Sequence, residues 1–276
     1  MTTPYQQQGA PVASYSSPIP VRKAHLGDAL ASEWTKIRSV RSTIWTLGVL
    51  ALLVVGIGLL VAVAISGSET DLAGQSVLSL GFFGVLLGSL CVITLGVLTI
   101  ASEYGTGMIR TTLTACPSRS RVLAAKAIVY FLLVLTVHLV LTLVVGALQT
   151  SMIGSGSAPT SEEWFRATFG VSFYVACLGL LAMAVGSLIR HSAGAITIML
   201  GVLLLPLVVG MFMYGESLRE IQTALLEYSI PNQLGVLYDN TVTESGPQGW
   251  EPLWIAIGVT AAALTAAFVA LNKRDV

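Results

Sequence analysis

The stretch VLSLGFFGVLLGSLCVITLGVLTIA, residues 77–101, decides the fold class of this chain. It runs for 25 residues without an Asp, Glu, Lys or Arg. About 20 such residues cross the hydrocarbon core of a bilayer as an α-helix. A continuous apolar run of this length predicts a membrane-spanning helix, because a barrel strand would alternate apolar and polar residues over a shorter length.

Five further runs of the same kind lie on either side of it. None contains a charged residue, and they cover residues 44–65, 127–148, 167–189, 193–214 and 253–271. The whole chain is 54% hydrophobic and only 10% charged, whereas soluble domains carry about 25% charged residues. The sequence therefore predicts an all-α, polytopic membrane protein with six transmembrane helices.

The basic residues are distributed unevenly between the two sides of these six spans. If the N-terminus is cytoplasmic, 12 of the 14 Lys and Arg residues fall on the cytoplasmic side, and only Arg166 and Arg219 fall outside. Basic residues close to span ends favour the cytoplasmic side. We expect both termini to be cytoplasmic.

The residues before the first span divide into two parts. Residues 1–22 contain four prolines and no apolar run, which predicts a disordered cytoplasmic tail. Residues 23–276 then form a single six-helix transmembrane domain. Within residues 26–41, apolar residues recur at spacings of four, four and three, which is typical of a helix lying in the headgroup plane; Trp34, Lys36, Arg38 and Arg41 mark this interface helix.

Two features inside the spans leave alternatives open. His138 falls in the middle of the third span, where it either takes part in proton transfer or bonds to a neighbouring helix beside Thr136 and Thr142. Gly84 and Gly88 form a G-x-x-x-G pattern that allows close helix approach, either within one bundle or between two chains. For the 215–252 segment we expect one or two short surface helices, begun by a capping box of Ser217 and Glu220 and stopped by Pro231. A mobile loop is the alternative.

The polar stretch SEYGTGMIRTTLTACPSRSRVLAAK, residues 102–126, interrupts the second and third spans. Gly105 and Gly107 are expected to break the second span, so that residues 108–114 form a short helix across the membrane surface. Pro117 and Ser118 can begin the helix that continues into the third span. The loop is either a basic anchor for topology or a docking element for a partner.

This stretch resembles the first cytoplasmic loop of bacterial ABC transporter permeases of the type-2 exporter superfamily. The shared pattern is E-Y-x-x-G-x-I-R-x-T-L from Glu103 to Leu113, then P-x-R-x-x-V-L-x-x-K from Pro117 to Lys126. The preceding SEWTKIRSVRSTIW, residues 32–45, is similar to the interface helix of the same family, with Glu33 before Lys36.

The resemblance implies a coupling helix seated in a separate ATPase subunit. In that picture Glu103 and Arg110 hold the docking element, Gly107 permits its turn, and Arg119 with Lys126 fix it at the headgroup boundary. The expected coupling residues are Glu103, Gly107, Ile109, Arg110, Leu113, Pro117, Arg119 and Lys126.

The resemblance also implies the partners. ATP and Mg²⁺ would bind the ATPase subunit and not this chain, which has no Gly-Lys dipeptide and hence no phosphate loop. The permease would pair with a second copy or a paralogue, contact membrane lipid, and bind no nucleic acid. We expect no catalytic residue and no metal site. The resemblance thus implies a permease subunit that exports a hydrophobic, drug-like, peptide or lipid substrate across the plasma membrane of a bacterium. A non-transporting membrane protein, such as an immunity or sensor subunit or a membrane-embedded lipid enzyme, is the alternative, and a secondary transporter is a third.

Overall fold

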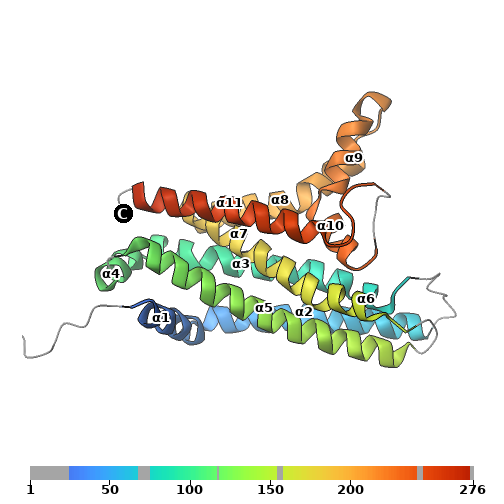
Figure 1. Ribbon diagram of the computed structural model, residues 1–276, viewed down its shortest axis with the longest axis horizontal. Helices are drawn as coiled ribbons and strands as arrows, with labels where there is room; N and C mark the ends of the chain where they lie inside the picture. Colours follow the sequence, from blue (N-terminus) through green and yellow to red (C-terminus); the bar gives the residue numbers. More distant parts are fainter. Residues whose placement is uncertain (1–24, 68–74, 117, 154–157, 241–244, 274–276) are drawn as a thin grey trace, which may run out of the picture.

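A computed structural model of the protein describes residues 25–67, 75–116, 118–153, 158–240 and 245–273. The described residues form helices joined by short connections (Figure 1). Six helical segments are long and apolar enough to cross a membrane, as the sequence predicts. They are α2 (Arg41–Ser66), η1 with α3 (Val77–Gly81 and Phe82–Gly105), α5 (Arg119–Met152), α6 with η2 and α7 (Ser161–Phe165, Arg166–Gly170 and Val171–Ile189), α8 (Ser192–Phe212) and α11 (Glu251–Lys273).

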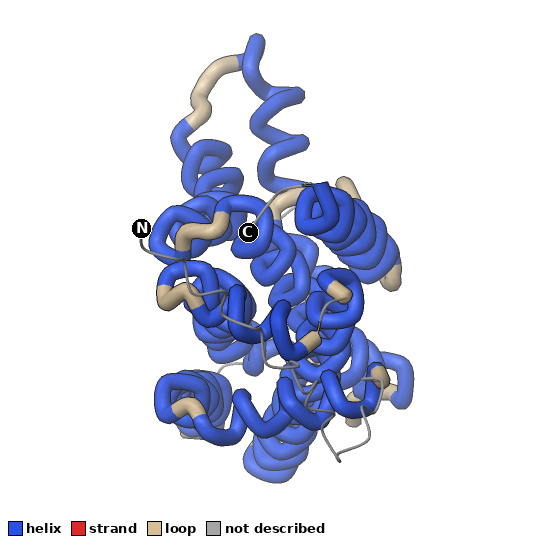
Figure 2. Tube along the Cα trace, turned by 90° about the vertical axis from the view of Figure 1, so that its left-hand side faces the viewer, coloured by secondary structure: helices blue, strands red, loops and turns tan. Residues whose placement is uncertain are grey.

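Two of these segments form the centre of the bundle. More than half of the most apolar window is buried in the α3 segment and in the α7 segment, whereas 11% is buried in α11 and 22% in both α2 and α8. Helix α7 packs against α3, α5, α8 and α11, and α3 packs against α2 as well. Figure 2 shows the helices side by side in a view along the bundle. The outer helices therefore keep most of their apolar surface free for lipid.

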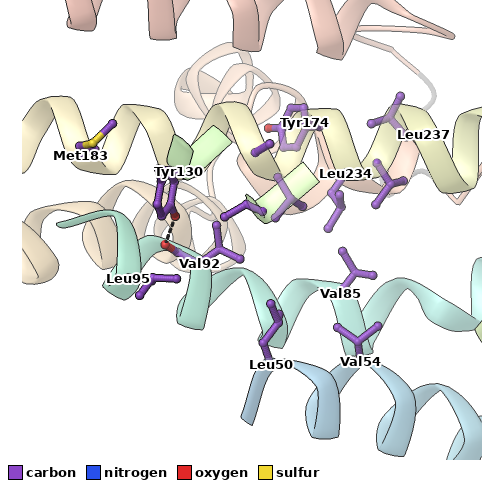
Figure 3. Packing of buried hydrophobic residues seen from close by; sticks show 14 of the residues in the cluster. Leu50, Val54, Val85, Val92, Leu95, Tyr130, Tyr174, Met183, Leu234 and Leu237 are labelled. Atoms are coloured by element: carbon purple, nitrogen blue, oxygen red, sulfur yellow. Dashed lines mark hydrogen bonds between the residues drawn. The ribbon is translucent and has the colours of Figure 1, made fainter. Parts of the chain in front are cut away.

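Close helix contacts in the centre depend on small residues. A Cβ atom on Gly84 would lie 2.8 Å from the Val54 carbonyl oxygen of α2, and one on Gly88 would lie 2.8 Å from Leu50 Cδ1. The G-x-x-x-G pattern therefore serves packing of α3 against α2 within the bundle. On the other side of α3, the buried Tyr130 hydroxyl of α5 donates a hydrogen bond of 2.7 Å to the Val92 carbonyl (Figure 3).

The intramembrane histidine lies between α5 and α7. His138 is fully buried, and its Nδ1 lies 3.3 Å from Ser172 Oγ on α7. Thr142 Oγ1 lies 3.4 Å from the same hydroxyl. The expected bond to a neighbouring helix is present, with Thr142 as its neighbour, while Thr136 is exposed.

Short helices lie at both ends of the bundle. Helix α1 (Leu26–Ser39) and helix α4 (Met108–Ala115) lie at the same end as the C-terminal end of α11 (Figure 1). The 34-residue α5 is about 50 Å long at 1.5 Å per residue, longer than the hydrocarbon core. Its first two turns, including Arg119 and Lys126, therefore extend the third span into the polar segment.

The segment between α8 and α11 departs from its predicted details. It contains η3 (Glu216–Leu218), α9 (Arg219–Glu227) and α10 (Ile230–Leu237). The predicted capping box is absent, because Ser217 lies inside η3 and α9 begins after Leu218 without a side-chain cap. Pro231 stands in the first turn of α10, where a missing N–H costs nothing, and does not stop α9. Helix α9 folds back on α8 through a hydrogen bond from Gln222 to the Gly210 carbonyl, and projects from the bundle (Figures 1 and 2).

Two other expectations concern the N-terminal region. The tail predicted over residues 1–22 lies outside the described residues. The amphipathic helix predicted over residues 26–41 is present as α1 but ends at Ser39. Val40 is extended and Arg41 is already the first residue of α2. This break turns the chain from α1 into the first span.

Candidate functional site

Helix α4 is held by a tight turn at the end of α3. Helix α3 ends at Gly105, and Gly107 caps α4 with a φ of 73°. Residues with a Cβ atom adopt this left-handed conformation at a cost in free energy, whereas glycine adopts it without that cost. The two glycines thus do what the sequence predicts, since they end the span and redirect the chain into a separate eight-residue helix.

The two faces of α4 differ in exposure. Ile109 is buried against the bundle, and Leu113 is half-buried. Arg110, Thr111 and Thr114 are exposed. The buried face fixes the helix to α3 and α5, and the exposed face is the one available to a partner. Of the predicted coupling residues on this helix, Arg110 alone is exposed.

A buried ion cluster lies directly behind α4. It joins Glu33 and Lys36 of α1, Glu103 of α3 and Lys126 of α5. Lys126 Nζ lies 2.8 Å from Glu33 Oε2 and 2.6 Å from Glu103 Oε1. Lys36 Nζ lies 2.8 Å from Glu33 Oε1 and 2.9 Å from Glu103 Oε1. The two carboxylates and two ammonium groups alternate, so the cluster as a whole carries no net charge.

This cluster is shielded from solvent on most sides. Lys126 is 1% exposed, Glu33 4% and Glu103 6%, whereas the Lys36 side chain keeps 29% of its surface accessible. Burial acts to lower the pKa of Lys36, but the hydrogen bonds and charges of Glu33 and Glu103 outweigh it and raise that pKa above 10.5. Lys36 therefore stays protonated and keeps the two carboxylates paired.

The position of Lys126 differs from the expected one. The sequence places it at the headgroup boundary with Arg119, but its side chain points into the bundle and joins three helices. Glu103 likewise faces the interior, behind α4. The helical periodicity does not distinguish the two outcomes, because a lysine at the end of a span can reach outward to headgroups or inward to a carboxylate.

The sequence interpretation gave Glu33 no role in the site. Glu33 pairs with Lys126 across 93 residues of the chain, and only its i, i+3 spacing to Lys36 is visible in the sequence. A carboxylate on the apolar side of an amphipathic helix was the signal that could have found it, since such a group needs a buried partner.

Other basic residues lie at the same end of the bundle. Arg119 donates a hydrogen bond of 3.1 Å to the Leu271 carbonyl near the end of α11. Arg38 lies over the half-exposed ring of Trp34, 6.0 Å from its centroid, and Arg41 is exposed. Pro117 lies outside the described residues. Arg190, just after α7, lies 5.0 Å from the centre of the Tyr104 ring and ties α7 to α3.

Comparison with known protein families gives a match that covers this site. The family described as ABC-2 family transporter protein matches residues 29–212, about two thirds of the chain, from α1 to the end of α8. The chain belongs to the ABC-2 transporter family. No curated protein matches it.

Membership of the ABC-2 family assigns the six apolar helices to a class of transport proteins. The protein is a multi-pass membrane transport protein, an ABC transporter permease. The permease component of such systems is normally not catalytic. ABC-2 proteins in general associate with an ABC ATPase subunit. The matched segment contains α1, the ion cluster and α4, so the candidate site lies within the family region of this ABC-2 protein.

Proposed function

We propose that this ABC-2 protein is the permease subunit of an ATP-driven exporter, with ATP hydrolysis on a separate ATPase subunit. ATP and Mg²⁺ would bind that subunit. The observation that carries the proposal is the construction of α4, a helix with one exposed face that is backed by a buried ion cluster joining α1, α3 and α5.

The cluster supports the coupling of a docking helix to the spans. A movable partner transmits force only through an element that does not yield, and a buried network of paired charges is costly to pull apart. Glu103 is two residues before the turn into α4, and Lys126 lies two turns into α5. A push on α4 would therefore reach the second and third spans and the interface helix together.

The proposed orientation follows from charge. The end of the bundle that carries α1, α4 and the start of α5 holds most of the basic residues, which favour the cytoplasm. An ATPase in the bacterial cytoplasm would meet the exposed face of α4. A second permease, either identical or a paralogue, would complete the transporter, and lipid would surround both.

A site-specific crosslink tests the docking of α4. A photoreactive amino acid at the exposed Thr114 should capture an ABC ATPase subunit in intact cells. The same amino acid at Ser151, which is exposed near the far end of α5, should capture none. Ile109 is unsuitable for this experiment because its side chain is buried.

Two results would separate the possible outcomes. Equal capture at both positions would mean that an ATPase subunit reaches both ends of the bundle, which would refute the proposed orientation and docking on α4. Absence of any ATPase adduct at Thr114, while the protein is present in the membrane at its normal level, would refute the ATP-driven assignment and favour a membrane protein that works alone.

A further inference from the structure

A largely apolar groove of about 640 Å³ lies between α1 and α5, which pack together at one end of the bundle (Figure 1). One wall consists of Leu30, Ala31 and Trp34 on α1, and the other comes from α5, between residues 128 and 137. The groove is open on its outer side, because Leu132 is 54% exposed and Trp34 is 44% exposed. A molecule in the surrounding membrane can therefore contact both walls directly.

The length of this groove matches the depth of one membrane leaflet. Residues 128–137 rise by about 14 Å along α5, at 1.5 Å per residue. This is about half of the ~30 Å hydrocarbon core. Lys126, just before this stretch, pairs with Glu33 and so fixes α1 at the mouth of the groove. From there the groove runs toward the bilayer centre, which is the course of an acyl chain in one leaflet.

A cation stands at the mouth of the groove. The Arg38 guanidinium lies 6.0 Å from the centre of the Trp34 ring, which forms part of the wall. Arg38 is exposed, and it pairs with no carboxylate among the residues that the structure describes. Tryptophan prefers the headgroup level of a membrane, and arginine binds phosphate through two parallel N–H groups. The mouth can thus receive an anionic group at headgroup depth.

The charges at this end of the bundle favour a lipid over a second copy of the chain as the occupant. The described carboxylates there are Asp28, Glu33 and Glu103. Glu33 and Glu103 are buried in the ion cluster, and Asp28 accepts a hydrogen bond of 3.0 Å from the His25 backbone at the start of α1. A second copy would bring apolar surface to the groove, but its carboxylates at this level are already engaged. An anionic phospholipid brings both an apolar chain and a phosphate for Arg38.

We propose that this groove binds one phospholipid with an anionic headgroup. Its acyl chain lies between α1 and α5, and its phosphate lies beside Arg38. The chain contacts the same two helices that the Glu33–Lys126 ion pair joins, so the lipid helps to hold the interface helix on the bundle. The inference involves no ATPase and does not depend on the proposed export function.

Photolabelling of the purified full chain in nanodiscs of phosphatidylcholine tests the site. The probe is a small fraction of phosphatidylglycerol that carries a diazirine halfway along one acyl chain. We expect its adducts to be concentrated on the peptides that contain residues 30–34 and 128–137. A phosphatidylcholine probe with the same diazirine should label these peptides about fivefold less, because one basic residue near the membrane surface favours an anionic lipid by about that factor.

Two matched pairs of variants separate the groove from the general membrane surface. Ala31→Trp fills the groove from an exposed position of α1 and should remove the excess labelling, whereas Ser32→Trp, at the next exposed position and outside the groove, should leave it unchanged. Arg38→Gln should lower labelling by the phosphatidylglycerol probe about fivefold, to the level of the phosphatidylcholine probe. Arg110→Gln, which removes an exposed arginine of α4, should not change it.

Three results would overturn the proposal. Adducts spread evenly over the outer helices α2, α8 and α11 would show that the groove holds no particular lipid. Equal labelling by the two probes, or equal losses in Arg38→Gln and Arg110→Gln, would exclude recognition of an anionic headgroup at Arg38. Protection of the groove peptides in nanodiscs that hold two copies of the chain, but not in those that hold one, would assign the groove to a second copy. A failure of the Thr114 crosslink would leave the labelling result intact, since no ATPase takes part in it.

Discussion

Replacement of Lys126 by methionine should destabilise the protein strongly, although methionine retains an unbranched apolar side chain. Lys126 is 1% exposed and pairs at 2.8 Å with Glu33 and at 2.6 Å with Glu103. Without it, Lys36 alone faces two buried carboxylates, and the cluster acquires a net charge of about −1. Removal of one partner from a buried ion pair costs about 3–5 kcal/mol, mainly because the remaining charge stays buried.

The measurement is the free energy of unfolding in mixed micelles, followed by tryptophan fluorescence. Lys273→Met is the matched control, because Lys273 is exposed in the last turn of α11. Exposed substitutions of this kind change stability by about 0.5 kcal/mol or less. The double variant Lys126→Met with Glu103→Gln restores neutrality and should be more stable than the sum of the single variants predicts.

Two results would refute this reasoning. If Lys126→Met cost no more than Lys273→Met, the cluster would not stabilise the bundle. If the double variant were simply additive, the effect would come from lost packing and not from an unpaired charge.

Two glycine substitutions test the fold and the coupling turn. Gly84→Ala should cost about 1–3 kcal/mol, because its Cβ would lie 2.8 Å from a backbone carbonyl of α2 that cannot move alone; Gly201→Ala, with no atom within 4 Å, should be neutral or stabilise by up to about 1 kcal/mol in the same unfolding assay. Gly107→Ala forces alanine into a φ of 73° at a cost of about 1–2 kcal/mol and should lower ATP hydrolysis by the assembled complex severalfold at an unchanged membrane level. Gly105→Ala, in the same turn but in open space, should hydrolyse ATP normally, and equal loss in both variants would exclude a conformational cause.

The extent of the fold predicted from the sequence follows from the physics of membranes. A helix that crosses lipid must satisfy its backbone hydrogen bonds within itself and be apolar over about 20 residues. Each of the six spans can therefore be predicted from the composition of its own segment. The break at Gly105 and Gly107 and the short helix after it are local features too, and the structure confirms them.

The details that the sequence missed involve choices between equivalent local patterns. Ser217 and Glu220 have capping-box spacing, but η3 occupies that position, and Pro231 begins a helix where it was expected to stop one. Neither pattern contains the contact of α9 with α8 through Gln222 and the Gly210 carbonyl, which joins separate segments.

The sequence alone determined that this protein lies in a membrane as a six-helix bundle, which end carries the positive charge, and where the polar loop begins its short helix. Only the tertiary structure decided that Lys126 turns inward and that Glu33, Glu103 and Lys126 meet. The reason is that apolarity is a property of each segment, whereas the pairing of a buried charge depends on a partner up to 93 residues away. No local pattern specifies which carboxylate a lysine will find once three helices pack together.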